Sequence, residues 1–155
     1  MTSPPARWLM KSEPVKYSFD DLVRDGRTMW DGVRNNQAAL YLKAMKVGDR
    51  AFFYHSSANP PAVVGIVEIV REAYPDPTAW DPNDDHHDPR ASPDNPLWSM
   101  VDVRLVETLP RPVPLDELRG VKALSGMELL RRGSRLSVQP VTAAEFRLVE
   151  KLARS

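Results

Sequence analysis

Hydrophobic and polar residues follow one another in short runs that predict strands separated by short helices. Runs rich in β-branched and aromatic residues favour strands. We expect five such strands, over residues 7–11, 51–57, 62–74, 97–108 and 136–141. In the fourth, Val101, Val103 and Leu105 alternate with polar residues and should face a core. Asp102 and Arg104 should then face solvent.

Capping signals indicate where helices begin. Ser18, followed three residues later by Asp21, has the form of a capping box, and Gly26 is a typical helix end. The buried side of this helix should consist of Phe19, Leu22 and Val23.

Further helices are predicted along the chain. Residues 36–45 carry apolar side chains at helical spacing, with Asn35 or Asn36 as the cap. Shorter helical segments are expected at residues 115–118 and 125–133. A second capping box at Thr142 opens a terminal helix.

Two features interrupt this pattern. Gly65 lies inside the third strand, where a glycine indicates a β-bulge or a close approach to the backbone, and we favour the bulge. Residues 75–96 are dense in proline, aspartate and asparagine and lack periodicity, so we expect a long irregular loop. Strands interleaved with helices too short for regular βαβ crossovers predict an α+β fold around a small mixed or antiparallel barrel.

The connection at residues 30–35 carries side chains suited to a planar ligand. Trp30 offers a large π face, Gly32 permits a sharp turn, and Arg34 and Asn35 provide planar hydrogen-bonding groups. A nucleobase is a planar molecule with polar edges, and it fits this set. The alternative is that Trp30 anchors the core and Asn35 only caps the following helix.

Seven segments in one order resemble the EVE domain, a PUA-like family that also includes the YTH readers of methylated RNA. They are residues 8–14, 30–35, 53–56, 65–68, 73–78, 100–103 and 136–141. The resemblance implies a PUA-like mixed β-barrel flanked by short helices, with a pocket for a modified base of DNA or RNA such as 5-methylcytosine. It implies a binding module and not an enzyme. One departure is Phe146, where family members often carry tryptophan, and this should affect the core and not the pocket.

Composition sets the class of protein. The chain has 155 residues, of which 42% are hydrophobic, and this fits a single domain over residues 1–155 with a disordered lead-in at residues 1–6. There is no cysteine, so disulfides and thiolate metal sites are excluded and a cytoplasmic location is expected. The apolar runs are too short to cross a membrane.

Charge is balanced over the chain and uneven along it. Lysine plus arginine and aspartate plus glutamate each number 21, which argues against binding nucleic acid by phosphate neutralisation alone. Residues 76–94 hold six acids and one base, a net charge of minus five, so nucleic acid should avoid them. Residues 111–155 hold nine bases and five acids, a net charge of plus four. Within them Arg131, Arg132 and Arg135 are candidates to hold phosphates, or are simply solvated surface residues.

Other kinds of chemistry find little support. Neither GxGxxG nor GxxxxGK[ST] occurs, so we expect no nucleotide cofactor. His86 and His87 lie next to each other on a loop without a second ligand cluster, so we expect no metal there. Two alternatives remain open. One is an enzyme acting on a modified base with Glu13 or His55 as acid and base. The other is a small-anion or protein-interaction domain in which Arg34 and the arginines near position 132 bind a carboxylate or phosphate.

The pocket should collect polar side chains from several predicted strand ends around the 30–35 turn. The expected ligand-binding residues are Lys11, Ser12, Glu13, Trp30, Arg34, Asn35, His55, Ser56, Ser137 and Gln139. A base stacked on Trp30 would gain about 1–3 kcal/mol. Asn35, Ser137 and Gln139 would read its polar edge.

Overall fold

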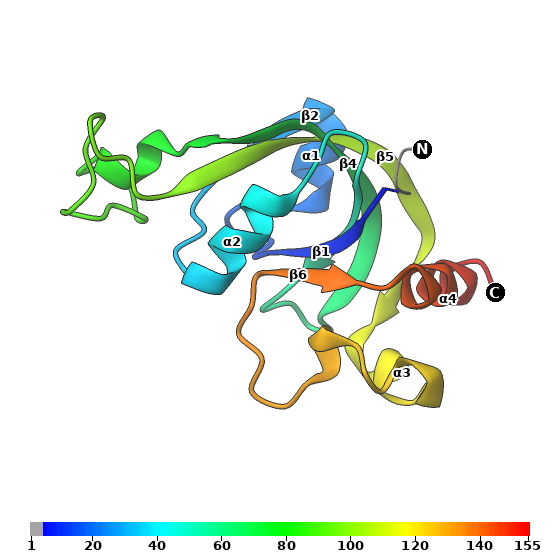
Figure 1. The fold of residues 1–155 in the computed structure, drawn as a ribbon. Coiled ribbons are helices and arrows are strands. Elements are labelled where there is room, and N and C mark those ends of the chain that lie inside the picture. Colours follow the sequence, from blue (N-terminus) through cyan, green and yellow to red (C-terminus); the bar gives the residue numbers. More distant parts are fainter. Residues whose placement is uncertain (1–4) are drawn as a thin grey trace.

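A computed structural model describes residues 5–155 and shows one six-stranded sheet (Figure 1). The strands are β1 (Arg7–Ser12), β2 (Arg27–Trp30), β3 (Arg50–His55), β4 (Ala62–Pro75), β5 (Ser99–Pro114) and β6 (Val138–Val141). Their order across the sheet is β2-β5-β4-β3-β1-β6. β1 and β3 run parallel, and the other neighbouring strands are antiparallel. The mixed α+β class predicted from the sequence is confirmed.

The barrel predicted from the sequence is not closed. Within residues 5–155, β2 and β6 each pair on one side only, so the curved sheet keeps two edges. Helix α2 (Asn36–Ala44) contacts β4, β5 and β6, strands from both parts of the sheet, and lies inside the curve (Figure 1). The helix therefore packs against the edge strand β6 and the inner strands β4 and β5, and the two edges of the sheet do not pair with each other.

Two hydrophobic cores lie on opposite faces of the sheet. Phe53 belongs to the core under α1 (Phe19–Asp25) and α2, together with Trp30. The adjacent residue Phe52 points the other way, because side chains alternate along a strand. It stacks on Phe146 with ring centroids 3.9 Å apart, in the core covered by α3 (Leu115–Arg119) and α4 (Ala143–Ala153). Phe146 thus contributes to the core remote from Trp30.

The predicted helix caps are confirmed. Ser18 and Asp21 form a reciprocal capping box, and Gly26 ends α1 in the left-handed conformation at a φ of 75°. Asn35 caps α2 by accepting a hydrogen bond from the Ala38 backbone, and Thr142 caps α4.

Several local predictions were wrong. Strand β2 was not foreseen. Residues 125–133 form only a 3₁₀ turn at Glu128–Leu130, and another 3₁₀ turn, Lys122–Leu124, precedes them. Val23 is 49% exposed, so it does not contribute to the buried side of α1. Asp102 is buried instead of exposed, because its carboxylate accepts hydrogen bonds from the Tyr74 hydroxyl and the Arg27 guanidinium.

Gly65 combines both of the roles considered for it. The register of β4 shifts on either side of this residue, which is the bulge that we favoured. A methyl group at Gly65 would also lie 2.1 Å from the Phe19 ring, so the backbone is closely approached by an aromatic side chain. Only glycine leaves room for that ring.

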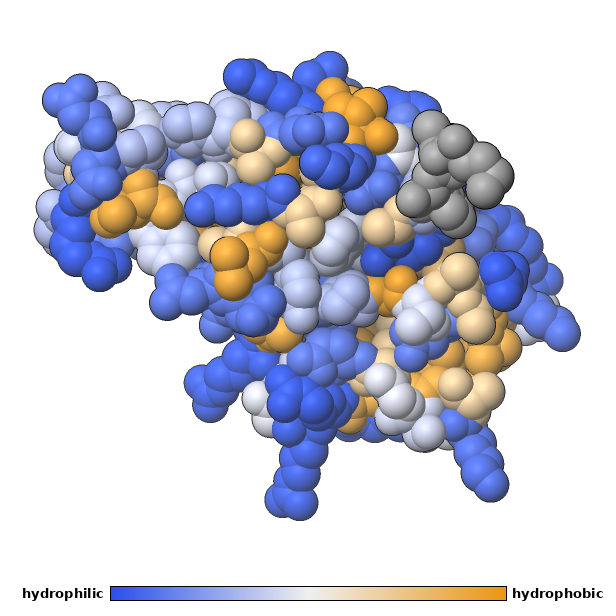
Figure 2. All heavy atoms as spheres, viewed as in Figure 1, coloured by the Kyte–Doolittle hydropathy of each residue, from blue (hydrophilic) through white to orange (hydrophobic). Residues whose placement is uncertain are grey.

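Residues 76–98 leave the sheet between β4 and β5 and form what we call the lobe. It contains a 3₁₀ turn, Pro77–Trp80, and is otherwise mainly irregular, as predicted. The lobe extends to one side of the sheet, and its visible surface is mostly hydrophilic (Figures 1 and 2).

The N-terminal lead-in predicted for residues 1–6 falls largely on residues 1–4, which lie outside the described residues. The Ala6 backbone N–H donates to the Asp49 carboxylate at 3.0 Å, so the chain is held from this point. Within residues 5–155, no helix has the length and apolar character needed to cross a bilayer.

Candidate functional site

A pocket of about 900 Å³ opens where several strands end. Its lining comes from five stretches of the chain. These are Lys11, Ser12, Glu13, Val15, Lys16 and Tyr17; residues 28–33; Ser56; residues 83–86; and Arg135 with Ser137. The pocket therefore lies between the ends of β1, β3 and β6, the 30–35 turn and the lobe.

The direction of the strands explains why the polar ends meet. β1 and β3 are parallel, so their C-terminal ends lie side by side at one end of the strands. β6 is antiparallel to β1, so it begins at this same end. The Lys11 backbone N–H donates to the Ser137 carbonyl at 2.8 Å, and the Ser56 N–H donates to the Ser12 carbonyl at 3.0 Å. These hydrogen bonds hold the three polar segments side by side.

Trp30 forms a largely buried wall of the pocket. It is the last residue of β2, and it packs edge-on against Phe53 with ring centroids 5.3 Å apart. Only 7% of the residue is exposed, so the broad open face expected from the sequence is absent. Trp30 is a core anchor, as the alternative interpretation held, and it also borders the pocket.

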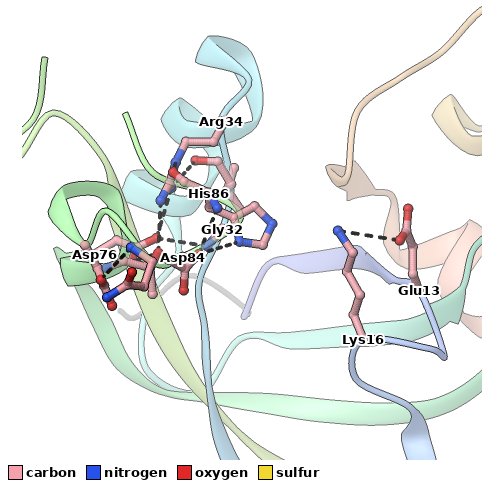
Figure 3. A network of polar contacts seen from close by, with 11 residues as sticks. Glu13, Lys16, Gly32, Arg34, Asp76, Asp84 and His86 are labelled. Atoms are coloured by element: carbon pink, nitrogen blue, oxygen red, sulfur yellow. Dashed lines mark hydrogen bonds and ion pairs between the residues drawn. The ribbon is translucent and has the colours of Figure 1, made fainter. Parts of the chain in front are cut away.

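The lobe is fixed to the 30–35 turn by the buried carboxylate of Asp76 (Figure 3). Asp76 accepts hydrogen bonds from the Gly32 backbone at 2.9 Å and from the Arg34 guanidinium at 3.0 Å. Gly32 has a φ of 80°, and a Cβ there would lie 2.7 Å from the His86 ring. The lobe can pack this closely only because residue 32 is glycine.

Docking of the lobe changes the electrostatic picture of the site. Residues 83–86 line the pocket, so the acidic segment that we expected nucleic acid to avoid forms one of its walls. Lys11, Lys16 and Arg135 line the same pocket. Figure 3 shows the Glu13–Lys16 ion pair apart from the Asp76 network. The pocket is thus bordered by both signs of charge.

Burial shifts the pKa values of three ionisable groups here. Burial alone would raise the pKa of Asp76, but hydrogen bonds from Thr78, Gly32 and Arg34 leave it below its usual value. Burial raises the pKa of Asp31, and the neighbouring Asp76 carboxylate adds to this effect. Burial lowers the pKa of Lys11, opposed by the charge of Glu128.

Arg34 and Asn35 do not line this pocket. The Arg34 guanidinium donates to the carboxylate of Asp76, the hydroxyl of Thr78 and the carbonyl oxygens of Val33 and His86. The Asn35 side-chain oxygen is occupied by the helix cap. These planar groups bind other parts of the protein. The same hydrogen-bonding groups would suit a planar ligand, so the sequence pattern alone could not distinguish the two cases.

His55 and Gln139 also lie outside the pocket lining. His55 Nε2 accepts from the Phe19 backbone at 2.9 Å, and burial lowers the pKa of its imidazole. Gln139 is fully buried, and its amide donates to the Leu136 carbonyl at 2.9 Å. Gln139 Oε1 has no hydrogen-bond partner among residues 5–155, and neither side chain borders the pocket.

The three predicted phosphate-binding arginines are placed differently. Arg135 lines the pocket, whereas Arg131 forms a bidentate ion pair with Glu128 at 2.7 and 3.0 Å. Arg132 is exposed and does not border the pocket.

Sequence reasoning missed several lining residues. They are Tyr17, Asp31 and the lobe residues Asn83, Asp84, Asp85 and His86. Asp31 lies inside the 30–35 stretch and was a detectable candidate. The lobe residues could not be assigned, because their place depends on how residues 76–98 fold back.

The geometry gives little support to the two alternative functions, an enzyme acting on a modified base and an anion-binding domain. Glu13 pairs with Lys16 at 3.8 Å, and His55 accepts a backbone hydrogen bond, so the expected acid and base do not meet in the pocket. Arg34, the centre of the anion alternative, has its donors engaged within the protein. Residues 5–155 hold no group of three or more His, Cys, Asp or Glu residues that could bind a metal ion.

A curved mixed sheet with a polar pocket at its strand ends defines a ligand-binding domain. The family model described as the EVE domain matches residues 6–152, and the chain belongs to this family. It is 46% identical over 166 aligned residues to human thymocyte nuclear protein 1, covering 95% of this chain and 73% of that protein.

Solved structures share the fold. A protein from Pseudomonas syringae is 45% identical with a TM-score of 0.93, covering 96% of this chain and 99% of that one. Human THYN1 protein in complex with 5-methylcytosine containing DNA is 44% identical with a TM-score of 0.91, covering 97% and 98% of the two chains. The YTH domain of Zygosaccharomyces rouxii MRB1 protein, at 13% identity and a TM-score of 0.56, shares the fold alone.

The cytoplasmic location predicted from the sequence is not upheld. The human and rat relatives are named nuclear proteins. A chain without cysteine is compatible with any reducing compartment, and both the cytosol and the nucleus are reducing. Composition therefore could not separate them.

Proposed function

We propose that this protein binds DNA and holds an extruded modified base, with 5-methylcytosine as the first candidate, in the pocket beside Trp30. The observation that carries this proposal is the pocket itself, about 900 Å³ in volume and bordered by aromatic, hydroxyl and charged side chains. Pockets for small molecules span about 300–1,000 Å³. The human relative crystallised with 5-methylcytosine containing DNA supports the choice of ligand.

The arrangement of charge supports an extruded nucleotide. Lys11, Lys16 and Arg135 border the pocket and can face the sugar-phosphate backbone. Ser12, Ser56 and Ser137 supply small polar groups beside the base. Trp30, with its small exposed area, can offer only part of its ring, so stacking should contribute less than full intercalation between two aromatic rings.

Selectivity for the modification should be moderate. Burying one extra methyl group contributes about 1 kcal/mol, which corresponds to about a fivefold difference in affinity. Within this proposal, residues 6–152 act as one binding module whose curved sheet is an open version of the PUA-like barrel.

The test is a titration of short duplexes that differ only in one cytosine or 5-methylcytosine, followed by fluorescence polarisation at several salt concentrations. Arg135→Gln should weaken binding to both duplexes and lower the slope of log affinity against log salt by about one. Arg147→Gln, an exposed arginine on α4 that does not border the pocket, is the matched control. Absence of binding to either duplex, or equal effects of both substitutions, would contradict the proposal.

A further inference from the structure

One acidic side chain in the pocket has an unused capacity to accept hydrogen bonds. Asp31 borders the pocket between Trp30 and Gly32. Among the residues that the structure describes, only its own backbone N–H donates a hydrogen bond to its carboxylate. The residue is accessible to solvent at the pocket, and an ionised carboxylate only accepts hydrogen bonds, so this group can accept one from a donor on a ligand.

The backbone on both sides of Asp31 is anchored. Trp30 pairs with Val101 in the sheet, and the Gly32 N–H donates to the buried Asp76 carboxylate at 2.9 Å. Asp31 therefore lies in a short stretch with little freedom to move. A pre-positioned acceptor loses little conformational entropy when a ligand binds.

Three other polar side chains of the pocket already have partners within the protein. The Ser12 hydroxyl donates to the Tyr17 carbonyl. The Asp84 carboxylate accepts from the His86 backbone at 2.8 Å, and Glu13 pairs with Lys16. Among the acids that line the pocket, Asp31 and Asp85 have no such partner in residues 5–155, and of the two only Asp31 is adjacent to Trp30.

We propose that Asp31 accepts a hydrogen bond from the exocyclic amino group of the bound base, so that the pocket selects amino bases over keto bases. The inference rests on the base-binding function proposed above and names the chemical class of the ligand. Cytosine presents an amino group at position 4, where thymine presents a carbonyl oxygen. Facing Asp31, that oxygen would meet an acceptor and leave the carboxylate without a donor.

The ionisation of Asp31 agrees with this role. Burial and the neighbouring Asp76 carboxylate raise its pKa, so its negative charge is disfavoured in the free protein. A donor on the ligand would relieve that cost. Groups with perturbed pKa values are common at functional sites, and this one also lies in a pocket.

The test compares 5-methylcytosine with thymine, two bases that share the 5-methyl group and differ at the edge concerned. Each is placed opposite an abasic site in an otherwise identical duplex, so that neither has to be unpaired. We expect the protein to bind the 5-methylcytosine duplex about tenfold more tightly, the effect of one hydrogen bond to a charged group.

Asp31→Asn should bring the two affinities to within about twofold, because an amide can accept from the amino group and donate to the carbonyl. Asp94→Asn removes the same charge from an exposed acid of the lobe that does not border the pocket, and it should keep the tenfold preference. Thermal unfolding of both variants shows that they are folded.

The outcomes separate the two proposals. If the unaltered protein binds neither duplex, base binding itself is wrong. If it binds both equally, or if Asp31→Asn retains the preference, only the assignment of Asp31 is overturned.

Discussion

Replacing Arg34 by methionine should loosen the lobe from the 30–35 turn. The guanidinium is 20% exposed, and its partner Asp76 is fully buried, with 3.0 Å between them. Removing one member of a buried ion pair costs about 3–5 kcal/mol, because the other charge remains without compensation. Asp76 keeps hydrogen bonds from the Gly32 and Thr78 backbones, so we expect the lower end, about 3 kcal/mol.

The measurement is the free energy of unfolding from urea titration, with hydrogen exchange of residues 83–86 as a local readout. Arg104→Met is the matched control, because Arg104 pairs with Glu68 at 3.2 Å on an exposed part of the sheet. Such a surface pair contributes about 0–1 kcal/mol. A loss below about 1 kcal/mol for Arg34→Met, with unchanged exchange in the lobe, would refute the idea that this ion pair holds the pocket wall.

Three further outcomes follow from the structure. Because the pKa of Asp76 is lowered, its stabilising effect is complete above the usual value of 3.8 and is lost as pH falls below it. Asp76→Asn should therefore weaken the fall in the free energy of unfolding at acidic pH, and an unchanged fall would exclude this cause. Gly65→Ala should cost about 1–3 kcal/mol in denaturant unfolding by pushing a methyl group into the phenylalanine ring packed there, whereas Gly126→Ala, with nothing within 4 Å, should not; similar losses would count against the packing argument. Burial and the hydrogen bond to Asp102 raise the pKa of Tyr74 to about 12. The last tyrosine ionisation step in an ultraviolet pH titration should therefore be absent in Tyr74→Phe, and its persistence would assign that step to another tyrosine.

Sequence patterns predicted structure well where the interacting groups are close along the chain. The caps at Ser18, Gly26 and Thr142 each involve residues within one helical turn. Burial of Asp102 could not be predicted in this way, because Arg27 is 75 positions away. A similarly large separation in sequence hid β2, whose pairing partner within residues 5–155 is β5.

The pocket was predictable in part for the same reason. Strand ends carrying Ser12, Ser56 and Ser137 meet because of strand direction, and the family resemblance already pointed to them. Arg34 was misassigned because a planar group with several donors binds a buried carboxylate as well as it binds a base. Which of these partners is present depends on how the lobe folds back, and no local pattern contains that information.

The lobe enters and leaves through adjacent strands of the sheet, and this has a consequence for how such a protein can change. Insertions or deletions within residues 77–97 need not alter the pairing of β4 with β5, provided that Asp76 still reaches Gly32. Depth and charge of the recess can therefore vary while the framework stays constant. A relative with a shorter or less acidic excursion at this point would accommodate a different guest on an identical scaffold.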